Sequence, residues 1–166
     1  DYGSLLSEPS GPVMTGYTFT GWYTDAACTN LWDFGSDMVT GEMTLYAAWT
    51  IHSYMVDFYS QGGTPVSSFS AEYNTTITSP LAPAHTGYTF TGWYTDEACT
   101  AEWDFASDVV TEDITLYAGW NINIYLVSFD ARGGSSVEYI SAEYNSTISE
   151  PTAPVRENYT FTGWYT

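Results

Sequence analysis

The sequence predicts an α+β fold that is predominantly β and is built from tandem repeats of 71 residues. The eight residues Tyr-Thr-Phe-Thr-Gly-Trp-Tyr-Thr occur at 17–24, again at 88–95 and again at 159–166, each copy 71 residues after the last. Apolar and polar residues alternate within the repeat, which is typical of half-buried strands. The chain is 44% apolar and 18% aromatic, which is enough for a packed core.

The repeat divides the chain into three segments. If a unit opens near Ile51 and closes near Asn121, residues 1–50 form the C-terminal part of one repeat, 51–121 a complete repeat and 122–166 the N-terminal part of a third. We call them the first, middle and third segments. Partial repeats would leave unpaired sheet edges, which soluble proteins avoid. We therefore expect a window on a longer array, or neighbouring copies that complete the ends in a fibre.

The middle segment opens with a predicted strand and turn. Residues 54–59 alternate, with Val56 and Phe58 on one face and Asp57 on the other. The Gln-Gly-Gly sequence at 61–63 supplies positions that tolerate positive φ, which predicts the turn of a hairpin.

The hairpin's second strand is expected within 66–71, and within 137–142 in the third segment. A connection with two prolines follows at 79–83 and again at 150–154. Because proline lacks a backbone donor and fixes φ, this connection is expected to be a loop or short helical turn rather than a central strand.

A third strand is predicted over 88–94, with Phe90 on the face opposite Trp93. Residues 96–101 are then expected to make one helical turn, with Asp96 as its N-cap. The unit closes on a strand at 114–120, whose inward side is expected to carry Ile114, Leu116, Ala118 and Trp120.

The seven tryptophans favour a core over a sugar-binding platform. They recur at fixed repeat positions, and small domains need large aromatic side chains to build a core. They are Trp22, Trp32, Trp49, Trp93, Trp103, Trp120 and Trp164.

The motifs resemble the Listeria–Bacteroides repeat, the B-repeat type of internalins. Three blocks carry the resemblance in order: Phe-Thr-Gly-Trp-Tyr-Thr-Asp at 90–96, Trp-Asp-Phe at 103–105 and Ile-Thr-Leu-Tyr-Ala-Gly-Trp at 114–120. The resemblance covers essentially the whole chain. It implies a compact β-grasp-like fold, a place in bacterial secreted or surface-anchored proteins and no enzymatic activity of the repeat. Family members commonly carry lysine, and this chain has none.

Charge excludes several partners. Twenty acidic residues against two basic ones, Arg132 and Arg156, give a formal net charge of −18. Nucleic-acid binding relies on Lys and Arg that displace counterions from phosphates, so we expect no nucleic-acid partner. No apolar stretch approaches the roughly 20 residues that span a bilayer, so no membrane insertion is expected in this segment.

No catalytic constellation can be assembled from the motifs. His52 and His85 are the only histidines, and they do not occupy equivalent repeat positions. A nucleophile–base pair built into a repeat would need both members at equivalent positions. We therefore expect no enzyme, no catalytic residue and no cofactor.

The candidate metal ligands do not form a site either. Cys28 and Cys99 are equivalent, one per repeat, and each is either a small buried apolar residue, which we favour, or half of an intermolecular disulfide. The acidic residues within 96–113 match no calcium loop, and the first segment has Ala26 in place of Glu97. We expect no metal site and a solvated acidic face.

Three Asn-x-Ser/Thr sequons are candidate glycosylation sites. They begin at Asn74, Asn145 and Asn158, and the first two are repeat-equivalent and lie in an expected exposed turn. Such triplets also arise by chance in a chain rich in Ser and Thr.

Two functions from different classes follow from these features. The favoured one is a structural tandem repeat of an extracellular bacterial or archaeal surface protein, serving as stalk, spacer or fibre subunit. Its partners would be neighbouring repeats and other copies in a fibre. The alternative is an adhesin module that binds a host protein or a glycan.

Overall fold

The protein consists of strands, turns and loops. A computed structural model describes residues 5–166 and contains no helix in that range, so the predominantly β prediction is confirmed. The chain divides into two compact units, and the division passes through the middle segment. Unit 1 comprises Asp1–Asp57, of which 5–57 are described, with Ser67–Ser79 and Trp103–Thr115. Unit 2 comprises Phe58–Val66, Pro80–Glu102 and Leu116–Thr166.

Unit 1 contains two antiparallel ladders. Strand β1 (Tyr17–Tyr23) pairs with β2 (Tyr46–Ile51). Strand β3 (Ser53–Tyr59), whose last two residues belong to unit 2, pairs with β4 (Phe69–Glu72) through four of its residues.

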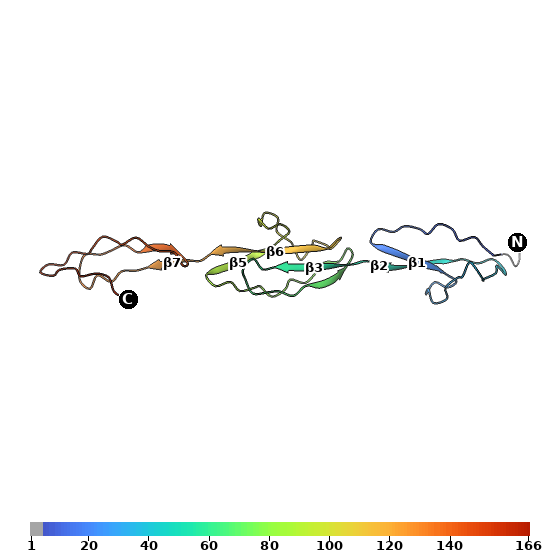
Figure 1. The fold of residues 1–166 in the computed structure, drawn as a ribbon, viewed down its shortest axis with the longest axis horizontal. Coiled ribbons are helices and arrows are strands. Elements are labelled where there is room, and N and C mark those ends of the chain that lie inside the picture. The colour runs from blue at the N-terminus through green and yellow to red at the C-terminus, as the bar shows by residue number, and fades with distance from the viewer. Residues whose placement is uncertain (1–4) are drawn as a thin grey trace. The chain divides into compact units, whose positions relative to one another are not determined.

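Unit 2 contains the next two ladders. Strand β5 (Tyr88–Tyr94) pairs with β6 (Ile114–Ile122), whose first two residues belong to unit 1, and β7 (Ile124–Val127) pairs with β8 (Ile140–Glu143). The middle segment forms one four-stranded sheet in the order β4-β3-β6-β5, at the centre of Figure 1. β1–β2 and β7–β8 are two-stranded sheets.

The ladders repeat with the sequence. Each pair of partners in β1–β2 is found 71 residues later in β5–β6, and β7–β8 repeats the register of β3–β4 in the same way. The repeated motifs therefore determine the local pairing as well as the composition.

The predicted hairpin turn is confirmed and its second strand is shifted slightly. Gln61 and Gly62 adopt positive φ values of 46° and 93°. β4 begins inside the predicted range 66–71 and ends one residue beyond it, at Glu72, and β8 is shifted in the same way.

The prediction that Trp93 faces away from Phe90 is wrong. The register of β5 shifts between Phe90 and Gly92, so Thr91 is an extra residue that forms a β-bulge. A bulge returns the next side chain to the face that strict alternation would deny it. The ring centroids of Phe90 and Trp93 are 5.5 Å apart, and Trp93 is only 2% exposed.

The helical turn predicted at 96–101 is also wrong. An N-cap would accept a hydrogen bond from an amide two or three residues later. Asp96 instead accepts from the amides of Thr100 and Ala101, and Cys99 has a φ of 54°, in the left-handed region. The segment is therefore a tight turn, and the α part of the predicted α+β class is absent from residues 5–166.

The core contains fewer tryptophans than predicted. Val56 and Phe58 are buried on one face of β3 and Asp57 is exposed, as the alternation predicted. Of the tryptophans, Trp32, Trp93 and Trp103 are buried, and the others are half-buried. Unit 1 buries Trp32, Val56, Ile77, Trp103 and Val110, and unit 2 buries Phe58, Trp93, Leu116 and Ala118.

Several positions are buried in the middle segment and not in its neighbours. Leu116 is fully buried and its equivalent Leu45 is half-buried, while Val56 is fully buried and its equivalent Val127 is half-buried. In the middle segment these side chains come from strands of a single four-stranded sheet. Among the described residues, the neighbouring segments form only two-stranded sheets, which leave part of each apolar face open.

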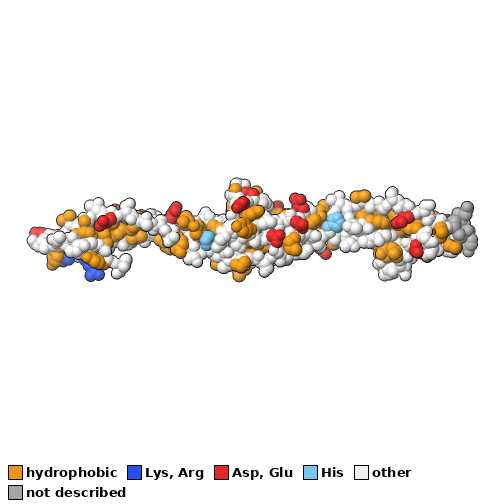
Figure 2. Space-filling view, in the orientation of Figure 1, with side chains coloured by type: hydrophobic (Ala, Val, Ile, Leu, Met, Phe, Trp, Pro, Cys, Tyr) orange, Lys and Arg blue, Asp and Glu red, His pale blue; other side chains and the backbone are white. Residues whose placement is uncertain are grey.

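The surface is acidic without a single acidic patch. On the face shown in Figure 2, the acidic side chains are scattered over the surface. The two arginines lie together, and Arg156 donates a hydrogen bond to the carbonyl oxygen of Arg132 at 3.0 Å.

Candidate functional site: the junction between repeats

The feature most clearly built by the repeat is the junction where one segment passes into the next. A single residue separates β2 from β3, and a single residue separates β6 from β7: His52 at the first junction and its equivalent Asn123 at the second. The first junction lies within unit 1 and the second within unit 2, so each can be described by itself.

The backbone bonds of the first junction tie two segments together. The amide of His52 donates to the carbonyl oxygen of Gly16, next to the start of β1, at 2.8 Å. The carbonyl oxygen of His52 accepts from the amide of Tyr73, next to the end of β4, also at 2.8 Å. One residue therefore connects the last ladder of one segment to the first ladder of the next.

The second junction repeats this pattern. The amide of Asn123 donates to the carbonyl oxygen of Gly87 at 2.8 Å, and its carbonyl oxygen accepts from the amide of Tyr144 at 2.8 Å. Because histidine and asparagine make the same backbone bonds, the geometry is set by the chain around them.

The side chains at the junctions bond in parallel ways. The hydroxyl of Thr18 lies 2.8 Å from Nε2 of His52. At the second junction the hydroxyl of Thr89 donates to Oδ1 of Asn123 at 2.6 Å. Both residues therefore add a side-chain tie to the strand that precedes the junction.

A glycine and a tyrosine close each junction. Gly16 has a φ of 78°, and a Cβ there would lie 1.9 Å from Cδ1 of Tyr73. Gly87 has a φ of 82°, and a Cβ there would lie 1.9 Å from Cδ1 of Tyr144. The tyrosine ring packs directly on the glycine backbone, which no other residue type would permit.

The sequence predictions missed this site. The glycines and tyrosines had been assigned only to turns and alternating strands. The available signal was the recurrence of Gly16 and Gly87 before a strand, together with Tyr73 and Tyr144 one residue before a sequon asparagine.

The acidic residues act as turn closures, in two repeat-equivalent pairs. Asp96 accepts from the amide of Ala101 at 2.8 Å and from that of Thr100 at 3.0 Å. The Ala101 amide holds the pKa of Asp96 below its ordinary value against the opposing effect of burial. At Asp25, burial by itself would raise the pKa, but hydrogen bonds from residues 29 and 30 outweigh it and lower the pKa.

The second pair closes the turn that follows the Trp-Asp-Phe motif. The amide of Ala106, at 2.9 Å, and the hydroxyl of Ser107, at 2.8 Å, hold the pKa of Asp104 below its ordinary value. The hydroxyl of Ser36 and then the amide of Gly35 do the same for Asp33. In the described part of the chain, no three His, Cys, Asp or Glu side chains form a group able to hold a metal ion.

These turns predict a pH dependence that can be measured on Asp104. Its folded-state pKa is lowered, so its contribution to stability is present at neutral pH and is lost as pH falls below about 4. Asp104→Asn should therefore be less stable than the parent protein at pH 7, and the difference should shrink towards zero in acid.

Chemical unfolding across this pH range checks the prediction. Glu112→Gln is the matched control, because Glu112 is an exposed acid that the first segment replaces with Gly41. It removes one negative charge without removing a turn closure. An acid-independent difference for Asp104→Asn would contradict the interpretation.

The candidate modification sites lie in turns. Asn74, Asn145 and Asn158 are exposed and have positive φ values of 60°, 58° and 62°. Cys28 and Cys99 are free thiols of intermediate exposure, so the favoured interpretation as fully buried residues is wrong.

The two histidines are far from any nucleophile–base pairing. His52 belongs to the first junction, and His85 stacks on Tyr88 with ring centroids 4.2 Å apart. His85 lines an open cavity of about 650 Å³ with Gln61, Cys99 and Trp120. Within residues 5–166 there is no helix with the length and hydropathy of a membrane span.

Comparison with known proteins identifies the repeat. The model of the Listeria–Bacteroides repeat domain matches residues 1–48, 54–119 and 125–166. Two proteins of Evansella cellulosilytica, described as a membrane protein and a Gly-rich membrane protein, are 48% and 47% identical over 165 residues. These matches cover 99% of this chain and 25% and 19% of the relatives.

A third relative is internalin H of Listeria monocytogenes, 47% identical over 93 residues, or 55% of this chain and 17% of the relative. The chain therefore spans a quarter or less of the length of each of these relatives. From its repeated motifs, its repeated ladders and three consecutive matches to one family model, the chain belongs to the Listeria–Bacteroides repeat domain family.

Proposed function

We propose that this chain is a non-enzymatic structural stretch of an extracellular surface protein and acts as stalk, spacer or fibre subunit. The observation that carries the proposal is the junction, which recurs with the same backbone bonds and the same glycine–tyrosine packing at two places. A spacer needs each segment to meet the next in a constant way, so that length follows copy number.

The proposed location rests on the relatives. Two are described as membrane proteins and one is an internalin. A net charge of −18 would favour solubility and mutual repulsion of such arrays outside the cell. The sequons at Asn74, Asn145 and Asn158 are proposed as glycan attachment sites, and Cys28 and Cys99 as intermolecular disulfide partners.

We further propose that 51–121 is the folding block, with a β-grasp-like arrangement in which turns replace the helix. Full burial of Val56, Trp93 and Leu116 in this segment supports the proposal, because their equivalents are only half-buried.

Residual dipolar couplings test the spacer role on an isotopically labelled chain. If the first junction is rigid, one alignment tensor should fit the amide couplings of β1–β2 and of β3–β4 together. Two independent tensors would contradict the spacer role. Saturable micromolar binding to a glycan or host protein, lost on substitution of exposed Tyr59, would instead support the adhesin alternative.

A further inference from the structure

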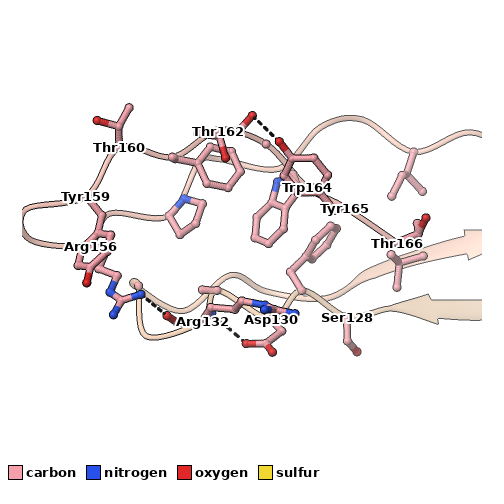
Figure 3. A pocket seen from close by; sticks show the side chains of 18 residues that line it. Ser128, Asp130, Arg132, Arg156, Tyr159, Thr160, Thr162, Trp164, Tyr165 and Thr166 are labelled. Carbon is pink, nitrogen blue, oxygen red and sulfur yellow. Dashed lines mark hydrogen bonds between the residues drawn. The ribbon is translucent and has the colours of Figure 1, made fainter.

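We propose that a cavity in the third segment is a docking groove for strand β2 of a second copy of this chain. The cavity has a volume of about 850 Å³, and its two walls are formed mainly by 127–132 and 159–166. Figure 3 shows Trp164 on one wall, projecting towards the wall that carries Ser128 and Asp130. This inference deepens the proposed function, because it names the surface and the partner by which chains would join.

The middle segment shows what occupies the equivalent space. The two walls correspond to the end of β3 and to β5, and in the sheet β4-β3-β6-β5 the strand between these two is β6. Leu116 and Ala118 of β6 are fully buried, and the indole of Trp120 donates to the carbonyl oxygen of Ser60 at 3.0 Å. A β6-type strand therefore fills this position wherever the sheet is complete.

The backbone of the first wall supports the same occupant. β3 continues to Tyr59, but its ladder with β4 ends at Val56. Residues 57–59 are therefore held as a strand by β6 on the other side. In the third segment, where no described strand occupies that side, β7 ends at Val127, the last residue that pairs with β8.

The second wall behaves in the same way. Residues 159–165 have the same sequence as β5, yet they form no strand in the described chain. Trp164 nevertheless keeps the packing of its equivalent, with ring centroids 4.9 Å from Phe129, as Trp93 lies 4.8 Å from Phe58. Both walls thus keep their side-chain arrangement while their backbones lack a ladder, which is the situation that strand addition uses.

Strand β2 has the sequence and the edge that the groove requires. Residues 44–49 match 115–120 at every position except 48. β2 pairs only with β1 in the described chain, so its second edge carries no ladder. Leu45 and Ala47, whose equivalents are fully buried in β6, are only half-buried.

The partner's β1 should arrive together with its β2. The resulting order β8-β7-β2-β1 would reproduce β4-β3-β6-β5, with β1 replacing 159–165, which has the same sequence. The one difference supports this. A Cβ at Gly119 would lie 2.4 Å from Thr91 of β5, whereas Ala48 is already accommodated beside β1.

Analytical ultracentrifugation of the 166-residue chain tests the proposal, with concentration raised from low micromolar to several hundred micromolar. The weight-average mass should increase with concentration. Ala47→Glu in the donor strand and Val127→Asp in the groove should each abolish the increase. The matched controls are Thr50→Glu, an exposed donor position, and Ser128→Asp, which places in the groove wall the residue found at Asp57; both should associate like the parent protein.

Mixing the two disruptive variants separates docking from misfolding. Ala47→Glu retains an intact groove and Val127→Asp retains an intact β2, so the mixture should form one-to-one dimers and nothing larger. A parent protein that stays monomeric throughout overturns the proposal. So does association that survives both substitutions, or a mixture that stays monomeric. The dipolar-coupling test reads a junction within one dilute chain, so docking can fail while the spacer role stands.

Discussion

Trp93→Ala is expected to lower the free energy of unfolding of the middle segment by about 3–5 kcal/mol, the usual range for deleting a buried tryptophan. Trp93 is 2% exposed, and its ring lies 4.8 Å from that of Phe58 and 5.5 Å from that of Phe90. Removing the indole would open a cavity among rigid aromatic neighbours and unpack the bulge in β5 that positions it. Amide hydrogen exchange of Leu116 and Ala118 in β6 provides a local measurement.

The repeat supplies matched controls for this substitution. Trp22 and Trp164 occupy the same motif position and keep edge-on contacts with Phe19 and Phe161, yet both are half-buried. Less apolar surface is lost there, so alanine should cost about 1–2 kcal/mol. Equal losses at the three positions would show that the core is not closed in the middle segment.

Gly16→Ala is expected to disrupt the first junction, and Gly87→Ala the second. A left-handed backbone costs an alanine about 1–2 kcal/mol, and the new Cβ would overlap the ring of Tyr73 or Tyr144. The tyrosine must move, and the hydrogen bonds that pass through the junction residue should weaken. Exchange of the His52 and Tyr73 amides should accelerate in Gly16→Ala, and the dipolar couplings should then require two tensors.

A double-mutant cycle separates the two contributions at the first junction. In Gly16→Ala combined with Tyr73→Ala the overlap is gone and only the backbone strain remains, so the two substitutions should cost less together than the sum of each alone. Gly41→Ala is the control, because a Cβ there meets no atom within 4 Å. Additive costs at Gly16 and Tyr73 would contradict the proposed packing.

Motif and alternation predicted much of the local structure correctly. The positive φ values of Gln61 and Gly62, the inward face of β3 and the buried Leu116 and Ala118 all follow from residue type and spacing. The position of Trp93 could not be predicted in this way. A bulge changes the side-chain period, and a single inserted residue reverses every assignment that follows it.

The junction was also beyond the reach of local reasoning. A sequence shows that Gly16 can adopt a left-handed backbone, and not that a tyrosine 57 positions later packs on it. Such contacts depend on how one ladder meets the next. The turn at 96–101 failed for a related reason, because the hydrogen bonds of Asp96 reach farther along the chain than those of a helix cap.

The sequence by itself determined the repeat, its period, the pairing register of each ladder and the family, because these depend on residue type and spacing. Only the tertiary structure decided which copies of a motif become strands and which side chains are fully buried. The residues of β5 and of 159–165 are identical, yet only β5, paired with β6, forms a strand. The physical reason is that a strand is stabilised by hydrogen bonds to its neighbour and by burial of one face, and both come from residues outside the strand itself.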